Sequence, residues 1–443
     1  MRIWVSLDRL GGSAVLVCRV GQEEHPWCPV APCPRVKKPR PARMTKTFSD
    51  SGDKAEHVKI TSRQKPGFLG RLSETSGGML IGLVVFSLSF YVHFTNEGRA
   101  VKTAASLDEG LSIVVSLDTV NRVEPQNEGR LVHLSGVLST SKPLNDPNYG
   151  ISIECVKLKR QVEMYQWIEY EDSKEYEENG EIKKETRYSY NTEWRSEVVS
   201  SRHFDREIAH QNPSAMAVES LTAVASGVQV GKFYLSKGLI DKIDNFKLLS
   251  LDKMQAPNVY ATVDGDYFYH SSNPRIPEVG DLRISFHYAG LSDSESPLGP
   301  ADKITVIGRQ TGDKIVAFQT ESGDILELLH FNALSAEEVF QKEHHSNTIK
   351  TWALRAGGWL LMFVGISLMT KIVYTLVDWL PLVRDLVKLG LNIFAVCVAT
   401  SLSLLTISFG WFFYRPLWAL VLGVLAAIPV VIVKSRASPK KHQ

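Results

Sequence analysis

The chain lacks cysteines where a secreted domain would need them. Its five cysteines are Cys18, Cys28, Cys33, Cys155 and Cys397, and only Cys155 lies in the long polar stretch 95–352. This stretch therefore cannot close an internal disulfide. It also lacks an Asn-x-Ser/Thr glycosylation acceptor, because proline disqualifies Asn212-Pro213-Ser214. These absences argue against a disulfide-rich, heavily glycosylated cell-surface ectodomain.

Strong charge of one sign and catalytic motifs are also missing. The formal net charge is +2 over 443 residues, which gives no basic field for nucleic acid. No Gly-x-Ser-x-Gly, His-Glu-x-x-His, phosphate-binding loop or dinucleotide fingerprint occurs. Cys28 and Cys33 have no second cysteine pair, and the neighbours His344 and His345 do not share a helix face. We expect no catalytic, cofactor-binding or metal-binding residue, and no enzyme.

Four long apolar segments are present, and they are unevenly placed. The first is 77–94, and the others are 353–371, 389–414 and 417–433. A helix needs about 20 apolar residues to cross a bilayer, and each segment is near that length. The sequence therefore predicts a multi-span α-helical membrane protein, with a large mainly-β (α+β) lumenal domain, residues 95–352, between spans 1 and 2.

Positive charge in the short flanking segments predicts the orientation. The basic flanking residues are Lys54, Lys59, Arg63, Lys65, Arg71, Lys371, Arg384, Lys388, Lys434, Arg436, Lys440 and Lys441. They lie in 44–76, in the connector 372–388 and in the tail 434–443, so we expect these parts to be cytosolic and the large domain to be lumenal. The connector is amphipathic, which is typical of a helix on the membrane surface, although a partner-binding helix fits the same pattern.

The end of the tail resembles a retrieval signal. Lys440 and Lys441 stand four and three residues from the C-terminus, as in the di-lysine signals of endoplasmic-reticulum membrane proteins. Such signals work only on a cytosolic tail, which is the side predicted above. A basic tail that binds anionic lipid is the alternative.

The polar stretch is predicted to form mainly β-strands. Alternating patterns at 162–170 and 186–194 flank Asn179-Gly180, which predicts a long hairpin with a charged, solvated tip. Further strands are expected at 130–138, 282–288, 303–309, 314–319 and 325–331. Ser335 and Glu338 match a capping box that begins a helix running through Lys350 toward span 2. Another helix is expected near 215–225.

Small residues in the spans predict close helix contacts. Gly78 and Gly82 have the spacing that permits close approach, and so do Ala353 and Gly357. Span 3 carries several hydroxyl side chains, and we expect Ser401 to pack at a helix contact. The alternative is that these hydroxyls line a pore, which would fit a channel or a conductance-modulating subunit.

Several segments together resemble the LUMA (transmembrane protein 43) family. They are Glu97-Gly-Arg-Ala, Asn127-Glu-Gly-Arg-Leu-Val-His, Glu163-Met-Tyr-Gln-Trp, Glu185-Thr-Arg-Tyr-Ser-Tyr-Asn-Thr-Glu-Trp-Arg-Ser, Asn212-Pro-Ser-Ala-Met-Ala-Val-Glu-Ser and Tyr414-Arg-Pro-Leu-Trp-Ala-Leu. The resemblance covers about 44–443. Residues 1–43 depart from the family and are expected to form a disordered extension, and Met44 resembles the family's usual start.

The resemblance carries functional expectations. It implies a protein of the endoplasmic reticulum and inner nuclear membrane that associates with itself and contacts emerin and lamins. It implies scaffolding, with a possible role as a signalling adaptor, rather than catalysis.

Overall fold

The computed structural model describes residues 56–64, 68–179, 181–251, 261–293, 296–376 and 381–417. The predicted extension 1–43, nearly all of span 4, the tail with Lys440 and Lys441, and part of the connector 372–388 lie outside the described residues.

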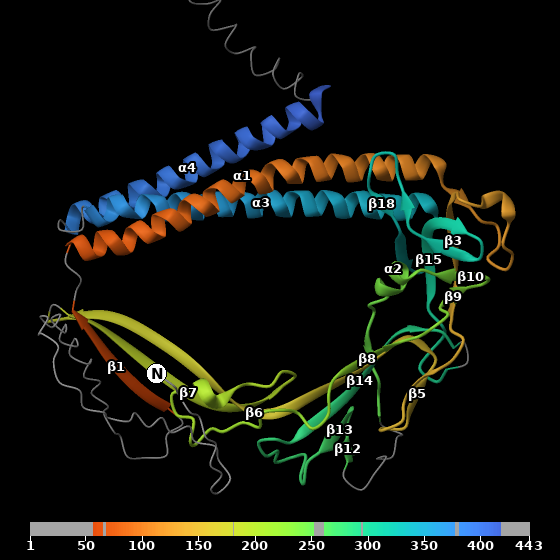
Figure 1. The fold of residues 1–443 in the computed structure, drawn as a ribbon, viewed down its shortest axis with the longest axis horizontal. Coiled ribbons are helices and arrows are strands. Elements are labelled where there is room, and N and C mark those ends of the chain that lie inside the picture. The colour runs from red at the N-terminus through yellow and green to blue at the C-terminus, as the bar shows by residue number, and fades with distance from the viewer. Residues whose placement is uncertain are drawn as a thin grey trace, which may run out of the picture. The chain divides into compact units, whose positions relative to one another are not determined.

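Three long helices contain the first three apolar segments. They are α1 (Phe68–Ile113), α3 (Ala336–Leu376) and α4 (Pro381–Tyr414). Each is long and apolar enough to cross a membrane. Figure 1 shows α1 and α3 side by side along most of their length, with α4 against the same pair. The prediction of three spanning-length helices before residue 417 is confirmed.

Both α1 and α3 extend beyond their apolar segments. α1 continues from Phe94 to Ile113, and α3 already begins at Ala336, well before Ala353. At about 1.5 Å per residue, each extension is roughly 25 Å long. The start of α3 is the predicted capping box: Ser335 N donates to Glu338 Oε2 at 2.8 Å, and Glu338 N donates to Ser335 Oγ at 3.2 Å. The polar stretch thus begins and ends in helix.

The rest of the described chain is mainly β, as predicted. The larger sheet has the order β1 (Glu56–Gln64), β7 (Glu181–Arg195), β6 (Cys155–Glu178), β14 (Leu282–Leu291), β13 (Tyr267–His270) and β12 (Thr262–Asp264). β8 (Leu221–Val224) also pairs with β6, and β11 (Lys247–Leu248) with β14. β6 and β7 form the expected long hairpin, with Asn179 in the left-handed conformation at its turn.

A second sheet has the order β19 (Leu328–Phe331), β15 (Lys303–Thr311), β16 (Lys314–Val316), β10 (Phe233–Leu235), β9 (Gln229–Val230), β3 (Leu131–Ser139) and β2 (Val115–Ser116). An additional β15–β3 pairing closes this sheet on itself. Val132, Phe233 and Val306 are fully buried in the resulting core. Two further pairs of short strands are present: β17 (Phe318–Gln319) with β18 (Ile325–Leu326), and β4 (Leu144–Asp146) with β5 (Ile151–Ile153). The region also contains one short helix, α2 (Lys237–Asp241).

One predicted helix is wrong. Residues 215–225 form an irregular segment that ends in β8, which pairs with Lys157–Arg160 of β6. The Ser220 hydroxyl accepts a hydrogen bond from Val162 N at 3.0 Å and helps to hold this segment on the sheet edge. Backbone pairing with β6 overrides the helical propensity of the alanines.

The first strand conflicts with the predicted sidedness. β1 pairs with β7 over its full length, from Glu56 opposite Ser189 to Gln64 opposite Glu181. These segments flank α1 in the chain, so a crossing by α1 would put them on opposite faces of a membrane. A polar strand ladder cannot pass through the hydrocarbon layer. The β1–β7 ladder and a crossing by α1 therefore exclude each other in one chain.

Candidate functional site: polar contacts that join the helices to each other and to the sheet

A buried ion pair joins α1 to α3. Arg355 Nε donates to Glu97 Oε1 at 2.7 Å, and Arg355 Nη2 donates to Glu97 Oε2 at 2.8 Å. The Glu97 side chain is 0% exposed and that of Arg355 is 12% exposed. This two-pronged geometry is the strongest form of an arginine–carboxylate contact, and it fixes the helices in register as well as holding them together.

The third helix joins the same carboxylate. Trp411 Nε1 of α4 donates to Glu97 Oε2 at 2.9 Å. The Arg355 guanidinium lies 4.7 Å from the Trp352 ring and 5.8 Å from the Trp411 ring. Gly410 makes this approach possible, because a Cβ there would lie 3.2 Å from Glu97. Tryptophan and arginine at the ends of apolar segments are typical of a membrane–water interface.

A second polar contact lies two residues along α1, at Arg99. Arg99 donates to Asn347 Oδ1 at 2.9 Å, to Asn96 Oδ1 at 3.0 Å and to Thr351 Oγ1 at 3.1 Å. Asn347 Nδ2 in turn donates to the Ala100 carbonyl at 3.0 Å. The paired helices are therefore joined by polar side chains just beyond their apolar segments, which explains how α1 stays helical through a polar sequence.

Deeper between the helices, His93 contacts α4. His93 Nε2 and Ser403 Oγ are 3.1 Å apart, and both side chains are buried. The His93 ring packs on Gly358 of α3, where a Cβ would lie 2.8 Å from the ring. His93 thus contacts both partner helices of α1.

Among the predicted packing residues, only Gly82 lies at a contact between the described helices. Gly82 lies at the α1–α3 contact, where a Cβ would meet Leu368 Cβ at 2.8 Å and the Gly365 carbonyl at 2.9 Å. Nothing lies within 4 Å of a Cβ built at Gly78 or Gly357. The close glycines of α3 are instead Gly358 and Gly365.

The contact predicted for Ser401 is not made among the described helices. Ser401 is exposed among the described helices, whereas the buried hydroxyl of α4 belongs to Ser403. Two positions along a helix turn a side chain by about 200°, so Ser401 points away from the contact that Ser403 makes. The hydroxyl side chains of span 3 do not by themselves distinguish Ser403 from Ser401. The signal in the sequence is His93, a polar side chain at the end of span 1 that needs a polar partner on a neighbouring helix.

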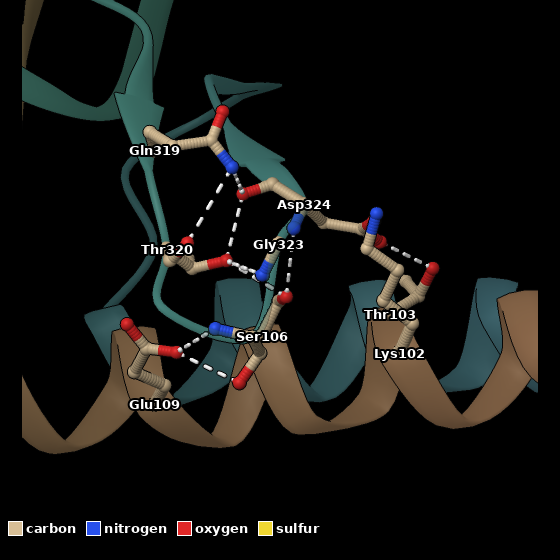
Figure 2. Close-up of polar contacts among 9 residues, drawn as sticks. Lys102, Thr103, Ser106, Glu109, Gln319, Thr320, Gly323 and Asp324 are labelled. Atoms are coloured by element: carbon tan, nitrogen blue, oxygen red, sulfur yellow. Dashed lines mark hydrogen bonds and ion pairs between the residues drawn. The ribbon is translucent and has the colours of Figure 1, made fainter. Parts of the chain in front are cut away.

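At the far end of α1, a turn of the β region docks on the helix (Figure 2). The Glu109 carboxylate accepts from Glu321 N at 2.7 Å, and from Ser322 N at 3.0 Å and Ser322 Oγ at 2.8 Å. Asp324 N donates to Ser106 Oγ at 3.2 Å. The 320–324 turn is therefore bonded directly to the helix.

The same turn is held by further polar and apolar contacts. Thr103 Oγ1 donates to Asp324 Oδ2 at 2.6 Å, and Lys102 pairs with Asp324 at 3.3 Å. Beneath the turn, a buried cluster joins Leu107 of α1 and Phe340 of α3 to Leu326 of β18. The same cluster includes Leu131, Ile307 and Leu328 of the second sheet, so the two helices pack directly on that sheet.

The comparisons with known proteins agree with the membrane character. The family model described as "Transmembrane protein 43" matches residues 164–416. Transmembrane protein 43 of Mus musculus is 62% identical over 398 residues, covering 90% of this chain and 100% of the relative. The Homo sapiens protein is 61% identical with the same coverage, and the Drosophila melanogaster homolog is 34% identical over 80% of this chain and 93% of its own length. No solved structure matches the chain. The chain therefore belongs to the transmembrane protein 43 family, a family of membrane proteins.

Proposed function

We propose that this protein is a non-enzymatic scaffold of the inner nuclear membrane and endoplasmic reticulum. In this role it organises membrane protein complexes, retains emerin, contacts lamins and associates with itself, and so helps to maintain the nuclear envelope. The family resemblance supports these partners, and a signalling-adaptor role would use the same surfaces.

The observation that carries the proposal is the unbroken path from apolar helix to β core. α1 and α3 run from their apolar segments into the buried cluster of Leu107, Phe340 and Leu326. The Glu97–Arg355 pair fixes their register on the way. Helices joined in this way hold a large folded region at a set distance and orientation from a membrane, which suits a scaffold.

We further propose that α1 crosses the membrane and that β1 then leaves β7. Leu80, Ile81, Val84 and Tyr91 of α1 are each more than 60% exposed. Apolar side chains at the same level of α3 and α4 are exposed too, including Leu360 and Leu404. Such a continuous apolar surface is stable in lipid and unfavourable in water. In the crossed form the termini lie on the cytosolic or nucleoplasmic face and the β region in the lumen.

The alternative function is a channel or a conductance-modulating subunit. An ion pathway through α1, α3 and α4 would need ionisable side chains that face water or an open route. Glu97 and Arg355 face each other instead, with Trp411 against the carboxylate. The described contacts favour the scaffold.

Cells that lack the protein offer the direct test. We expect the parent chain to restore emerin at the nuclear rim, and proximity labelling from both membrane faces to recover emerin and lamins. A Leu107→Asp variant should still enter the membrane but lose rim emerin, because the β region is uncoupled from α1. Absence of envelope partners, together with a conductance in reconstituted vesicles, would contradict the scaffold and favour the channel.

A further inference from the structure

Strand β7 becomes the edge of the larger sheet when α1 crosses the membrane. β1 lies beside β7 (Figure 1) and pairs with Glu181–Ser189, and among the described residues no strand pairs with 190–195 on that side. The crossing removes β1, because β1 precedes α1 in the chain and β7 follows it. All of β7 then presents unpaired backbone groups, and a long unpaired edge readily binds a further strand.

Alternate residues of β7 direct their backbone groups away from β6. Tyr165 N of β6 donates to the Asp281 carbonyl, and Gly280 N donates to the Tyr165 carbonyl, both on the side of β14. The partner of Tyr165 on β7 is Trp194, which therefore exchanges no backbone bonds with β6. Because strand geometry repeats at every second residue, the even-numbered residues from Ile182 to Trp194 direct their N–H and C=O groups to the open edge.

A second copy of β7 fits this edge over the full length of the strand. Tyr188 is the midpoint of Glu181–Arg195, so a two-fold axis at Tyr188 pairs every residue of β7 with a residue of the copy. Even-numbered residues then meet even-numbered residues, as an antiparallel ladder requires. The opposing pairs are Glu181 with Arg195, Ile182 with Trp194, Lys183 with Glu193, Lys184 with Thr192, Glu185 with Asn191, Thr186 with Tyr190, Arg187 with Ser189, and Tyr188 with itself.

Charges on one face of the paired strands are complementary. Glu181 opposes Arg195 and Lys183 opposes Glu193, and each pair occurs twice by symmetry. Within the chain, Lys183 already pairs with Glu178 and Arg195 with Glu193, and these four side chains are between 28% and 51% exposed. Ion pairs so exposed contribute little, so they do not compete with the contacts between copies, and directly opposed charges of opposite sign stabilise an antiparallel pair.

Neighbouring registers oppose like charges. An axis moved by one residue to Arg187 places Glu181 opposite Glu193, and an axis moved to Ser189 places Glu185 opposite Glu193. Like charges directly opposite each other destabilise a strand pair. The charge pattern of β7 therefore favours the axis at the midpoint of the strand.

The other face of the paired strands is apolar and aromatic. Ile182 meets Trp194 of the second copy, and the two Tyr188 rings meet at the axis. Aromatic pairs of this kind also stabilise an antiparallel ladder. The two copies thus match on both faces of the strand.

A carboxylate beside β7 loses its partners when β1 leaves. Asp205 Oδ1 accepts from Lys59 Nζ at 2.6 Å, and Asp205 Oδ2 lies 3.1 Å from His57 Nε2. The Asp205 side chain is only 13% exposed, so it needs a replacement donor. His57 stands opposite Tyr188 in the β1–β7 ladder. Tyr188 of the second copy takes that position, from which its hydroxyl can donate to Asp205.

We propose that two copies of the chain associate through β7, which continues the larger sheet from one copy into the other across a two-fold axis at Tyr188. The inference rests on the proposed crossing by α1, and it names the surface for the self-association proposed above. Since β1 holds the same edge before α1 crosses, the association is confined to inserted chains.

A single cysteine at the axis tests the pairing in the full chain, in isolated membranes under mild oxidation. In the parent, every cysteine except the fully buried Cys155 is replaced with serine. Tyr188→Cys places two thiols opposite each other, with Cα atoms about 5.5 Å apart, which permits a disulfide. We expect most of the inserted chain to run as a disulfide-linked dimer, and a chain that stays monomeric would overturn the proposal.

Lys184→Cys is the matched control on the same strand. Its counterpart in the second copy lies opposite Thr192, roughly 27 Å along the strand from Lys184, so this variant alone should give no dimer. Adding Thr192→Cys should restore the dimer, because positions 184 and 192 then face each other twice. A dimer from Lys184→Cys alone, as abundant as that from Tyr188→Cys, would overturn the register.

Charge exchange tests the register by a second measurement. Lys183→Glu and Glu193→Lys are placed in separate chains that carry different affinity tags. Either variant alone opposes like charges across the axis, whereas a mixed pair restores both contacts between opposite charges. We expect mixed pairs to exceed the statistical ratio about fivefold when the tagged chains are co-purified. Recovery at the statistical ratio would contradict the assigned pairs.

Failure of the pairing is distinguishable from failure of the scaffold. Resistance to alkaline extraction reports insertion, and emerin at the nuclear rim reports the scaffold. An inserted chain that restores rim emerin but forms no dimer at position 188 would overturn the pairing and leave the scaffold intact. A dimer in a chain that does not restore rim emerin would support the pairing and contradict the scaffold. A chain extracted by alkali would contradict the anchoring on which both depend.

Discussion

Arg355 of α3 donates two hydrogen bonds to a Glu97 carboxylate of α1 that is closed off from solvent, at 2.7 and 2.8 Å. Removing one partner of such a pair leaves an uncompensated buried charge, which costs about 3–5 kcal/mol. We expect Glu97→Leu to lower the free energy of unfolding of the helices by that amount in a detergent titration followed by circular dichroism. The double variant Glu97→Leu with Arg355→Leu should recover much of the loss. A single variant as stable as the parent would show that the pair does not hold the helices.

Two glycines of α3 differ from each other in what surrounds them. A Cβ at Gly365 would lie 2.8 Å from Phe86 N of α1, whereas nothing lies within 4 Å of one at Gly357. We expect Gly365→Val to separate the helices at a cost of about 1–3 kcal/mol, measured in the same titration. Gly357→Val is the matched control and should leave packing between α1 and α3 unchanged. Equal effects of the two variants would contradict the assigned contact.

Two serines of α4 also differ in their surroundings, and their leucine variants can be compared. Ser403→Leu removes the partner of His93 and places a larger side chain in a buried contact. We expect it to lower the melting temperature of the helices, while Ser401→Leu leaves that temperature unchanged because its side chain is exposed. A Ser401→Leu variant that melts normally but assembles differently would place Ser401 between copies. A normal Ser403→Leu variant would refute the His93 contact.

The docked turn in Figure 2 can be loosened selectively. Glu109→Leu removes the acceptor of three hydrogen bonds from Glu321 and Ser322. We expect the amides of these two residues to exchange hydrogen several-fold faster by mass spectrometry. Ser112→Ala, nearby on α1, is the control, since among the described residues its hydroxyl bonds to the Glu109 carbonyl and not to the turn. Unchanged exchange in Glu109→Leu would show that other contacts hold the turn.

Local patterns in the sequence were enough to predict the three long helices, most of the long strands and the capping box. Apolar length is enough to predict a spanning helix, and alternation around Asn179-Gly180 is enough to predict a hairpin. Ser335 and Glu338 mark the start of α3 because the signal lies within four residues.

What could not be predicted depends on how helices and strands face one another. A shift of one residue, from Gly357 to Gly358, turns a position by about 100° and changes its neighbours completely. The helical extension of α1 depends on side chains of α3, since Arg99 is bonded to Asn347 and Thr351. Strand β1 was not predicted, because its partner β7 lies more than 100 residues away in the chain and the basic residues of 56–64 indicated only a charged flank of span 1.

The decisive question is whether α1 crosses the membrane and so separates β1 from β7. Thr61 and Lys184 are direct partners in the β1–β7 ladder, close enough for introduced thiols to form a disulfide. The parent for this test replaces Cys18, Cys28, Cys33 and Cys397 with serine. Cys155 can stay, because burial raises the pKa of its thiol to about 12 and keeps it unreactive.

The measurement is disulfide formation between Thr61→Cys and Lys184→Cys in intact membranes under mild oxidation. Lys174→Cys with Glu185→Cys, partners within the β6–β7 hairpin, is the positive control. We predict a disulfide in the control and none between positions 61 and 184, with position 61 labelled by an impermeant reagent from the cytosolic face. A disulfide between positions 61 and 184 in the membrane-inserted chain would contradict the crossing by α1, and with it the proposed anchoring.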